Sequence, residues 1–428
     1  MNTEKNDFFH LIYKYIETLK NHILMKLVER HIISKSDKRW KSLDNICFLS
    51  KNLYNSAIYK IKKNYEETGK FIRYNDLERE FKINNQPDYR GMVIGSSQQT
   101  LMLVDKSLTS YFKLLSKYKK NKKSLNGCPK FPKYKDKIKG RFIVVFTIGQ
   151  AKLKNGYIYF PKRSGIEPIK TNVQSLKQVR IIPQSSCYII EVVYEKQEKE
   201  KINNDHYLSI DLGVNNLMTC YDTKNNKSFI INGRPLKSIN QYYNKKKSKL
   251  QERLMKNHKK YNSNRINKLT LKRNNKISDC LHKSSRFIVD YCVRENIGNV
   301  IVGYNKEWKS DCNIGKKNNQ NFIQIPHRIT LNMLSYKSLL EGLNYIENEE
   351  SYTSKCSALD LEPLNKQKKY MGKRVKRGLF VSSTGIKINA DLNGALNILR
   401  KVAPDKEQEI VQSLRCIGQA IWPLKINL

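Results

Sequence analysis

Apolar residues at helical spacing and short runs of β-branched and aromatic residues divide the first half of the chain into predicted helices and strands. The segment "MKLVERHII" at 25–33 predicts a short strand, and helical spacing follows it to about residue 122. The clearest predicted helix spans 96–118, with apolar positions Leu101, Val104, Leu108, Phe112 and Leu115. Runs of β-branched and aromatic residues at 142–148 and 187–196 predict a small β unit that closes against the first strand.

The second half of the chain predicts an α/β domain beyond the polar linker 195–206. Strand signals lie at 208–211, 217–221, 228–231 and 299–303, and they alternate with long helical segments. The segment 276–296 carries an apolar stripe and is expected to be a packing helix, whereas 238–262 is so basic that we expect a polyanion to neutralise it.

The net charge of the whole chain also predicts a polyanionic partner. The 428 residues include 81 Lys and Arg against 38 Asp and Glu, a formal charge of +43. The basic residues are spread from end to end among 10% aromatic residues, a pattern typical of a long nucleic-acid channel. The alternative is a Lys-rich surface that reflects an A+T-rich genome, although this would not by itself remove acidic residues.

Cysteine usage and hydropathy indicate a reducing compartment and no membrane partner. The nine cysteines include no CxxC pair and no disulfide framework, and there is no apolar span of about 18 residues. We therefore expect a cytoplasmic protein with reduced thiols. Residues 1–24 are expected to be an N-terminal extension, with Met25 as the alternative start. No oligomeric state follows from the sequence.

Two carboxylates stand at places that would hold them firmly. Asp211 ends the apolar run of "LSIDLGVNN" and is followed by the turn residue Gly213. Asp391 precedes "NGALNIL", in which Gly394 and Ala395 permit a helix to pack closely on a sheet. As alternatives, Asp211 is only a turn former and Asp391 only a helix N-cap.

These segments together resemble the TnpB (OrfB) proteins of bacterial insertion sequences, which are relatives of the type V CRISPR effectors. The resemblance runs from about Met25 to Leu399 through the following motifs, in this order: "SKNLYNSAIY", "SSQQTLMLVDKS", "PKFPKYKDK", "IDLGVNNL", "IVGYNKEWK", "ESYTSKC" and "NADLNGALNIL". It implies a mixed fold, α/β plus α+β. An RNase H-like (RuvC) nuclease domain would follow a small β-barrel (wedge) domain with an inserted helical lobe.

The resemblance also implies a domain layout. It comprises wedge-like β-barrel segments at 25–37 and 123–200, a helical recognition lobe at 38–122, a RuvC-like domain at 206–402 with a basic insertion at 237–295 and a degenerate zinc-ribbon region at 356–388, and a C-terminal tail at 403–428.

The resemblance assigns Asp211 and Asp391 to a catalytic carboxylate triad, but the family's glutamate is absent after "VIV", where this chain has Gly303. Some relatives, including the Fanzor proteins, carry this glutamate on a neighbouring strand just before the "TS" motif. Glu350 stands there, and Gly303 would leave room for it. Strand alternation favours Glu350 over Glu349 and Glu307; loss of catalysis is the alternative.

Three such carboxylates would hold Mg²⁺, with two ions expected, for phosphodiester hydrolysis. Most family members also insert a zinc ribbon before the last Asp. Here Cys356 is alone, since 357–390 contain no other Cys or His, so no structural zinc is expected. The basic region is predicted to be a loop that contacts nucleic-acid phosphates, or otherwise a solvated insertion.

The partners implied by the resemblance are a guide RNA from the transposon end and a double-stranded DNA target with a short flanking motif. Candidate readers of that motif are Tyr54, Asn55, Gln98 and Gln99. Candidate phosphate contacts on the basic helix are Lys245, Lys246, Lys247, Lys249 and Arg253. The expected function is RNA-guided DNA cleavage. Its alternatives are a nuclease-inactive RNA-guided repressor and a transposase that uses the same carboxylates.

Overall fold

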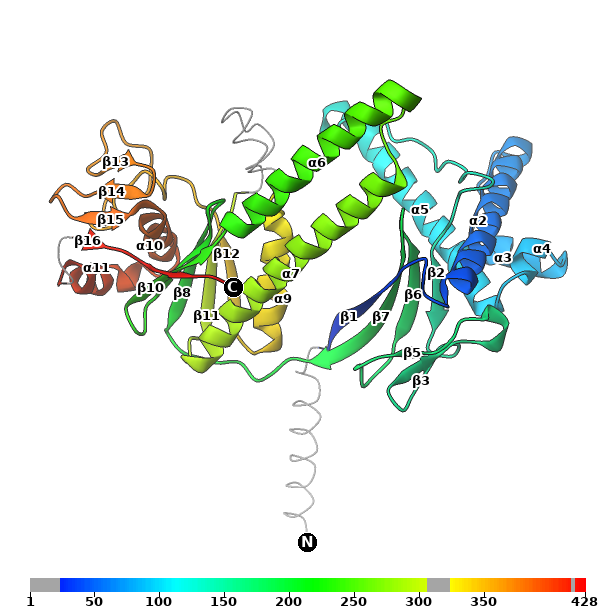
Figure 1. Cartoon of the computed structure of the whole chain (residues 1–428), viewed down its shortest axis with the longest axis horizontal. Coiled ribbons are helices and arrows are strands. Elements are labelled where there is room, and N and C mark those ends of the chain that lie inside the picture. The colour runs from blue at the N-terminus through cyan, green and yellow to red at the C-terminus, as the bar shows by residue number, and fades with distance from the viewer. Residues whose placement is uncertain (1–23, 306–323, 417–419) are drawn as a thin grey trace, which may run out of the picture. The chain divides into compact units, whose positions relative to one another are not determined.

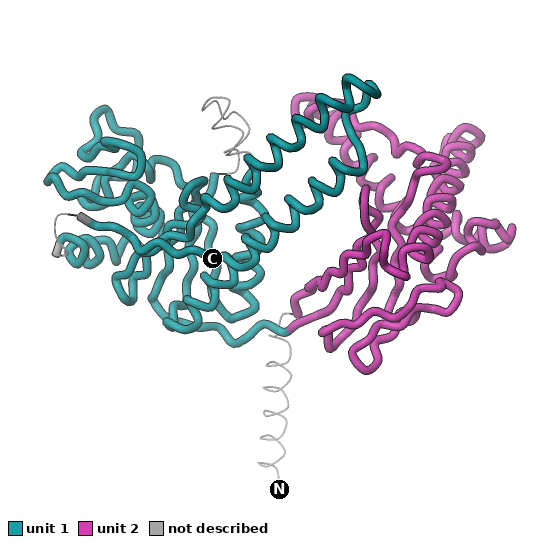
Figure 2. The backbone as a smooth tube through the Cα atoms, viewed as in Figure 1, with its two compact units in different colours: residues 1–23, 197–428 teal, residues 24–196 magenta. Residues whose placement is uncertain are grey.

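The computed structural model describes residues 24–305, 324–416 and 420–428. It divides into two compact units, one formed by Leu24–Lys196 and the other containing Gln197–Leu428 (Figure 2). The division falls within the segment 195–206 that we predicted as a linker. Within the described ranges, no helix is both long and apolar enough to cross a membrane.

The unit Leu24–Lys196 combines four helices with two sheets (Figure 1). Its helices are α2 (Trp40–Thr68), α3 (Tyr74–Ile83), α4 (Pro87–Arg90) and α5 (Ile94–Lys120). One sheet has the order β1 (Leu24–Ile33), β7 (Tyr188–Gln197), β6 (Gln178–Pro183) and β2 (Val144–Thr147). The other joins β3 (Lys152–Lys154), β4 (Tyr157–Tyr159) and β5 (Ile169–Lys170). The predicted strands and the long helix are thus confirmed, whereas the closed barrel remains a prediction.

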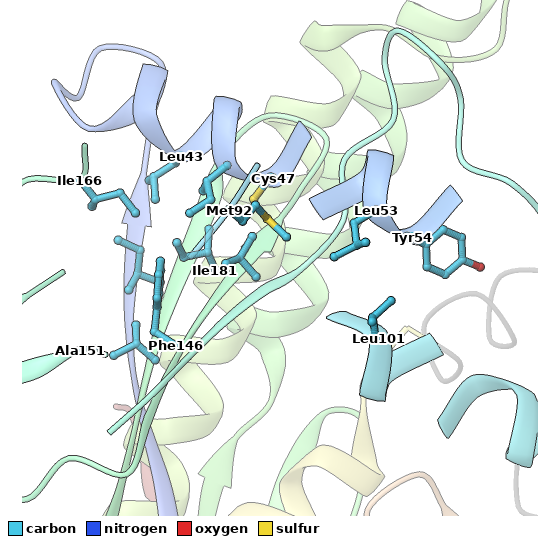
Figure 3. Packing of buried hydrophobic residues seen from close by; sticks show 14 of the residues in the cluster. Leu43, Cys47, Leu53, Tyr54, Met92, Leu101, Phe146, Ala151, Ile166 and Ile181 are labelled. Atoms are coloured by element: carbon cyan, nitrogen blue, oxygen red, sulfur yellow. The ribbon is translucent and has the colours of Figure 1, made fainter. Parts of the chain in front are cut away.

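One core holds this unit together. Leu101, Val104 and Leu108 recur at helical spacing on α5 and are buried, as the sequence predicted. They belong to the same apolar cluster as Leu53 of α2 and Phe146 of β2 (Figure 3). The two long helices therefore pack on the sheet through one apolar face each.

The second unit is built on a six-stranded sheet (Figure 1). Its strand order is β12 (Asn344–Asn348), β11 (Asn299–Gly303), β8 (Tyr207–Leu212), β9 (Asn216–Asp222), β10 (Lys227–Asn232) and β17 (Leu424–Ile426). β8, β9 and β10 pair antiparallel, whereas β11 pairs parallel with both β8 and β12. The carboxyl ends of β8, β11 and β12 therefore lie at one edge of the sheet.

The two faces of this sheet are covered by different helices. Val300 and Val302 of β11 share a core with helices α7 (Asn264–Arg294) and α9 (His327–Leu340). Ile301 lies in a separate core with α10 (Ala390–Val402) and α11 (Glu407–Cys416). Because side chains alternate along a strand, each residue of β8 and β11 is assigned to one of these faces. Helix α6 (Arg234–His258) packs along α7.

The region predicted as a basic loop before Asp391 is partly a sheet, which corrects that expectation. It contains β13 (Lys373–Lys376), β14 (Leu379–Val381) and β15 (Lys387–Asn389), which is joined by β16 (Ala420–Ile421). Phe380 and Ile388 are buried in the α10 core. The sequence did not predict this hairpin, because its few apolar residues are scattered among lysines. This pattern arises because the α10 core covers only one side of the hairpin.

Candidate functional site

Strand alternation points Asp211 toward helix α10. Leu208, Ile210 and Leu212 of β8 lie in the α7 core, so the intervening residues face the opposite side. Asp211 lies within β8, opposite Thr219 of β9. It is therefore part of the strand, and the turn-former alternative does not describe its position.

Helix α10 approaches Asp211 closely because Gly394 has no side chain. A Cβ atom at Gly394 would lie 2.9 Å from Oδ2 of Asp211, tighter than ordinary van der Waals contact. The helix begins with Asn389 as its N-cap, whose side chain accepts from the backbone N–H groups of Asp391 and Leu392. Asp391 therefore does not cap the helix. Its Oδ2 accepts a hydrogen bond of 2.7 Å from Asn216.

Glu350 reaches the same sheet edge from the loop after β12. A Cβ atom at Gly303 would lie 2.9 Å from Oε2 of Glu350 and 2.4 Å from Cδ1 of Ile398. The space at the end of β11 is thus filled by Glu350 and α10. Asn305 accepts from the Glu350 backbone N–H at 3.3 Å, and the Thr353 hydroxyl donates to the Glu350 carbonyl at 2.8 Å.

The neighbouring glutamates are directed elsewhere. Glu347 is exposed on β12 and forms an ion pair of 2.8 Å with Arg328. Glu349 is also exposed, and Lys401 lies 3.4 Å from its carboxylate. The other alternative, Glu307, lies outside the described residues. Among the three described glutamates, only Glu350 adjoins the space at Gly303.

Asp391 and Glu350 both act electrostatically on Asp211. Burial raises the pKa of Asp211 well above its ordinary value, and the negative charges of Asp391 and Glu350 raise it further. Burial also raises the pKa of Glu350 to about 7, with Glu349 as the next contributor. Arg374 partly opposes the rise at Asp211. Asp211 is thus a carboxyl that two other negative charges, Asp391 and Glu350, act on.

A row of polar side chains on α10 fixes the loop that carries Glu350. Asn397 donates to the carbonyls of Thr353 and Cys356 at 2.8 and 2.7 Å, and Asn393 donates to Cys356 at 2.9 Å. One turn further, Arg400 donates to the carbonyl of Glu362 at 3.1 Å. We did not identify these residues from the sequence, although polar residues four apart on an otherwise apolar helix were the available signal.

The buried Cys356 belongs to this loop. Its thiol donates to the carbonyl oxygen of Pro363 at 3.4 Å, and burial raises its pKa. Two backbone N–H groups, from Ser357 and Met371, donate to the buried carboxylate of Glu362 at 2.7 and 2.9 Å. Hydrogen bonds to side chains therefore organise the segment that we predicted as a degenerate zinc-ribbon region.

A cationic recess adjoins the carboxylates. It has a volume of about 330 Å³ and is lined by Arg234, Arg374, Arg377 and Asp391, among others. Arg374 lies 3.5 Å from Asp391. Guanidinium groups bind phosphate oxygens in a planar, bidentate manner, so the recess suits an anion next to the carboxylates. The sequence analysis marked Arg374 and Arg377 only as part of a basic region, and it did not single out Arg234.

The donor set has the chemistry that Mg²⁺ requires, because it consists of hard carboxylate oxygens. The repulsion that raises the pKa of Asp211 is also what a bound cation would relieve. Within the described parts of the chain, however, no group of three or more Asp, Glu, His or Cys side chains is placed so that it could hold a metal ion. The carboxylates thus fit the ion chemically but do not form a preassembled cage.

Two of the candidate motif readers hold a basic strap, residues 128–141, against α2. The Tyr54 side chain is 4% exposed and its hydroxyl donates to the Lys133 carbonyl at 3.2 Å. Asn55 both donates to the carbonyl and accepts from the N–H of Lys135, at 3.0 and 2.8 Å. These bonds order the strap, and contact of Tyr54 or Asn55 with bases stays a prediction.

The other two candidate readers lie on α5 and already have side-chain partners. Gln98 donates to Glu78 at 3.3 Å, and Gln99 lies 3.5 Å from the sulfur of Met102. Their role as readers also stays a prediction.

The basic helix presents its predicted phosphate contacts to solvent. Lys245, Lys246, Lys249 and Arg253 of α6 are exposed and Lys247 is half-buried. The single acidic residue of α6, Glu252, lies 3.4 Å from Lys256. Among the described residues, Glu252–Lys256 is the one ion pair of this helix. Neutralisation by an external polyanion and the individual phosphate contacts stay predictions.

Comparisons with known proteins agree with this architecture. The family OrfB_IS605, described as "Probable transposase", matches residues 190–309, and the Cas12f1-like TNB domain matches residues 327–398. The chain is similar to Cas12f1 in the cryo-EM structure of a Cas12f1–sgRNA–target DNA complex, with a TM-score of 0.51, 15% sequence identity, and coverage of 84% of this chain and 81% of that chain.

A second solved structure is more distant, and the curated proteins give no match. The mini-RNA-guided endonuclease CRISPR-Cas_phi3 has a TM-score of 0.44 and 12% identity over 90% of this chain and 94% of that chain. No curated protein matches the chain.

The fold and the matched segments define a mixed α/β protein with the fold of Cas12f1. The first family match includes Asp211, and the second includes Glu350 and Asp391. The chain is a TnpB-like relative of the type V CRISPR effectors, which confirms the resemblance seen in its motifs.

Proposed function

We propose that this protein is a transposon-encoded, RNA-guided DNA endonuclease that hydrolyses phosphodiester bonds at a RuvC-like carboxylate site. The observation that carries the proposal is the close approach of α10 to Asp211 at Gly394, together with that of the Glu350 carboxylate to the end of the neighbouring strand β11 at Gly303. The sheet supports it, since three antiparallel strands are followed by two parallel ones, the arrangement expected of an RNase H-like fold. The Cas12f1 structure contains guide RNA and target DNA, and we propose the same classes of partner here.

In this proposal Asp211, Glu350 and Asp391 would hold Mg²⁺. When bound, the ions supply an activated water and stabilise the leaving oxygen. Asn216 orients Asp391 through its hydrogen bond, while Asn305 and Thr353 fix the backbone of Glu350.

The arginines beside the carboxylates have a separate role. Arg234, Arg374 and Arg377 bind the backbone phosphates next to the cleaved bond, since their recess adjoins Asp391. They hold the strand so that its phosphodiester faces the carboxylate edge. The positive charge also attracts the DNA over longer distances.

Cleavage with matched variants tests the proposal. RNA that copurifies with the full chain is sequenced, and the protein loaded with this RNA is given matching plasmid DNA with randomised flanks. Glu350→Gln is expected to abolish Mg²⁺-dependent cutting, whereas Glu349→Gln, one residue away and exposed, is expected to cut like the parent. Equal activity of both variants would reject Glu350 as a catalytic residue.

The two other functions give different results in the same assay. A nuclease-inactive repressor retains the RNA and the matching DNA without cutting it, whatever the metal. A transposase joins donor ends to target DNA. Recovery of a random mixture of cellular RNA would contradict the guide.

A further inference from the structure

A second recess lies between the two long helices that follow β10. α6 and α7 run antiparallel and pack along each other (Figure 1). Between them is a cavity of about 420 Å³ whose lining includes Tyr242, Tyr243, Leu269, Lys272 and Lys276. Nothing in the carboxylate site uses these residues.

The floor of this recess is fixed by contacts within the protein. The hydroxyl of Tyr243 lies 3.0 Å from that of Thr270 on the facing helix. Arg273 donates to Asn240 at 2.8 Å and to the Gln324 carbonyl at 3.0 Å. Tyr243 and Arg273 are therefore structural, and they keep the helices at a set separation.

Tyr242 is placed differently, because its ring is turned outward. It is 61% exposed although it lines the recess, and the ammonium group of Lys246 lies 5.8 Å from its ring centroid. An exposed aromatic ring beside a cation is a platform on which a planar base can stack.

Rows of like charge flank the ring on both helices. Lys268, Lys272 and Lys276 follow one another at four-residue intervals on α7 and are all exposed. On α6, Lys246, Lys249 and Arg253 share a face with Tyr242. Residues 234–278 contain fifteen Lys and Arg but a single acidic residue. Like charges four residues apart destabilise a helix, so these rows need an external polyanion.

We propose that the groove between α6 and α7 binds a single strand of nucleic acid, with one unpaired base stacked on Tyr242 and the backbone phosphates between the two cationic rows. Successive lysines four residues apart rise about 6 Å along the helix, a spacing suited to following a strand. A duplex would not use Tyr242, since its bases are already stacked on one another. This assignment rests on the proposed function, to which it adds a binding site.

Equilibrium binding measures the stacked base directly. The full chain, freed of copurifying nucleic acid at high salt, is titrated in EDTA against labelled oligo-dT, oligo-U and a duplex of equal length. Tyr242→Ala is expected to weaken single-strand binding roughly 5- to 150-fold, and Tyr242→Phe is expected to bind like the parent because it keeps the ring. The matched control is Tyr261→Ala, since Tyr261 is 69% exposed and is not part of the recess.

The cationic rows give an independent readout through salt. Lys272→Ala combined with Lys276→Ala is expected to reduce the slope of log K against log salt by about 1.4 for a single strand. Tyr242→Ala is expected to leave that slope unchanged, since stacking releases no counterions. Comparison of oligo-dT with oligo-U shows whether the site prefers DNA or RNA.

Three results would overturn the assignment: equal affinity of the Tyr242→Ala and Tyr261→Ala variants, equal loss of affinity for duplex and single strand, or failure of Tyr242→Phe to restore binding. Binding is measured in EDTA, where the protein does not cut, so this site is tested separately from the nuclease. A protein that binds a single strand through Tyr242 but never cleaves DNA in Mg²⁺ would contradict the proposed nuclease and support this site. A chain that cleaves without using Tyr242 would do the reverse.

Discussion

The space at Gly303 makes a quantitative prediction about the carboxylate site. In Gly303→Ala, the new Cβ would lie 2.4 Å from Cδ1 of Ile398 and 2.9 Å from Oε2 of Glu350. Carbon atoms pack best about 3.5–4.0 Å apart, so both neighbours must move. Overpacking of this kind costs about 1–3 kcal/mol of the free energy of unfolding. Displacement of the Glu350 carboxylate should also slow cleavage.

A double-mutant cycle separates the two contacts. Ile398→Val removes the nearer atom and by itself costs about 0.5–1.5 kcal/mol, the usual cost of one buried methylene. Combined with Gly303→Ala, it should cost less than the sum of the two single changes, by about 0.5–3 kcal/mol. Cleavage should stay slow in the double variant, because the contact with Glu350 remains.

The assay is urea unfolding, with hydrogen exchange of the β11 amides to assign the transition to the unit Gln197–Leu428. The control is Gly127→Ala, where a new Cβ meets nothing within 4 Å and stability should change by at most about 1 kcal/mol. Strict additivity of the Gly303 and Ile398 changes, or a Gly303→Ala variant as stable and active as the control, would refute the claim that this glycine makes room for Glu350.

Three further predictions concern charge and hydrogen bonding. Asp211→Asn should raise the melting temperature in EDTA while it abolishes cleavage. The folded-state pKa of this carboxyl is raised, so the gain should be absent near pH 4 and grow with pH. Burial lowers the pKa of Lys337 to about 8. As pH rises from about 8 to 10.4, the free energy of unfolding of the parent should therefore increase by about 3 kcal/mol relative to that of Lys337→Met. A difference between the two proteins that does not change with pH would contradict this. Asn397→Ala removes the donor to the buried Thr353 carbonyl and one of the two donors to the Cys356 carbonyl, which keeps Asn393. It should cost about 1–3 kcal/mol in urea unfolding, against almost nothing for the exposed Asn275→Ala.

Local patterns and charge were readable from the sequence. Short apolar runs predicted β8 to β11, because strands that are covered on both faces are apolar along much of their length. Helical spacing predicted α5 and α7, because each of these helices buries one apolar face. Asp211 and Asp391 stood in motifs whose order along the chain identified the family. The excess of positive charge pointed to a polyanionic partner, which a count of residues can show without a fold.

The sequence predicted Glu350 for a different reason from the contacts that place it in the structure. Alternation along a strand was the reason to prefer it to its neighbours, yet β12 ends at Asn348, two residues earlier. Glu350 is placed by the space at Gly303, by the hydrogen bond that its backbone N–H donates to Asn305, and by the one that its carbonyl accepts from Thr353. These residues are up to 50 apart in the chain, and no local pattern links them.

By itself, the sequence determined the strands β8 to β11, the helices α5 and α7, the sign of the charge, and Asp211 and Asp391 as candidate site residues. Each depends on residues close together in the chain or on a simple count. Only the tertiary structure decided which face of β8 carries Asp211, which arginines stand beside Asp391, and that side chains of α10 hold the Glu350 loop. Those contacts arise when segments distant in sequence pack, and their distances are set by the shapes of the helices and sheet between them.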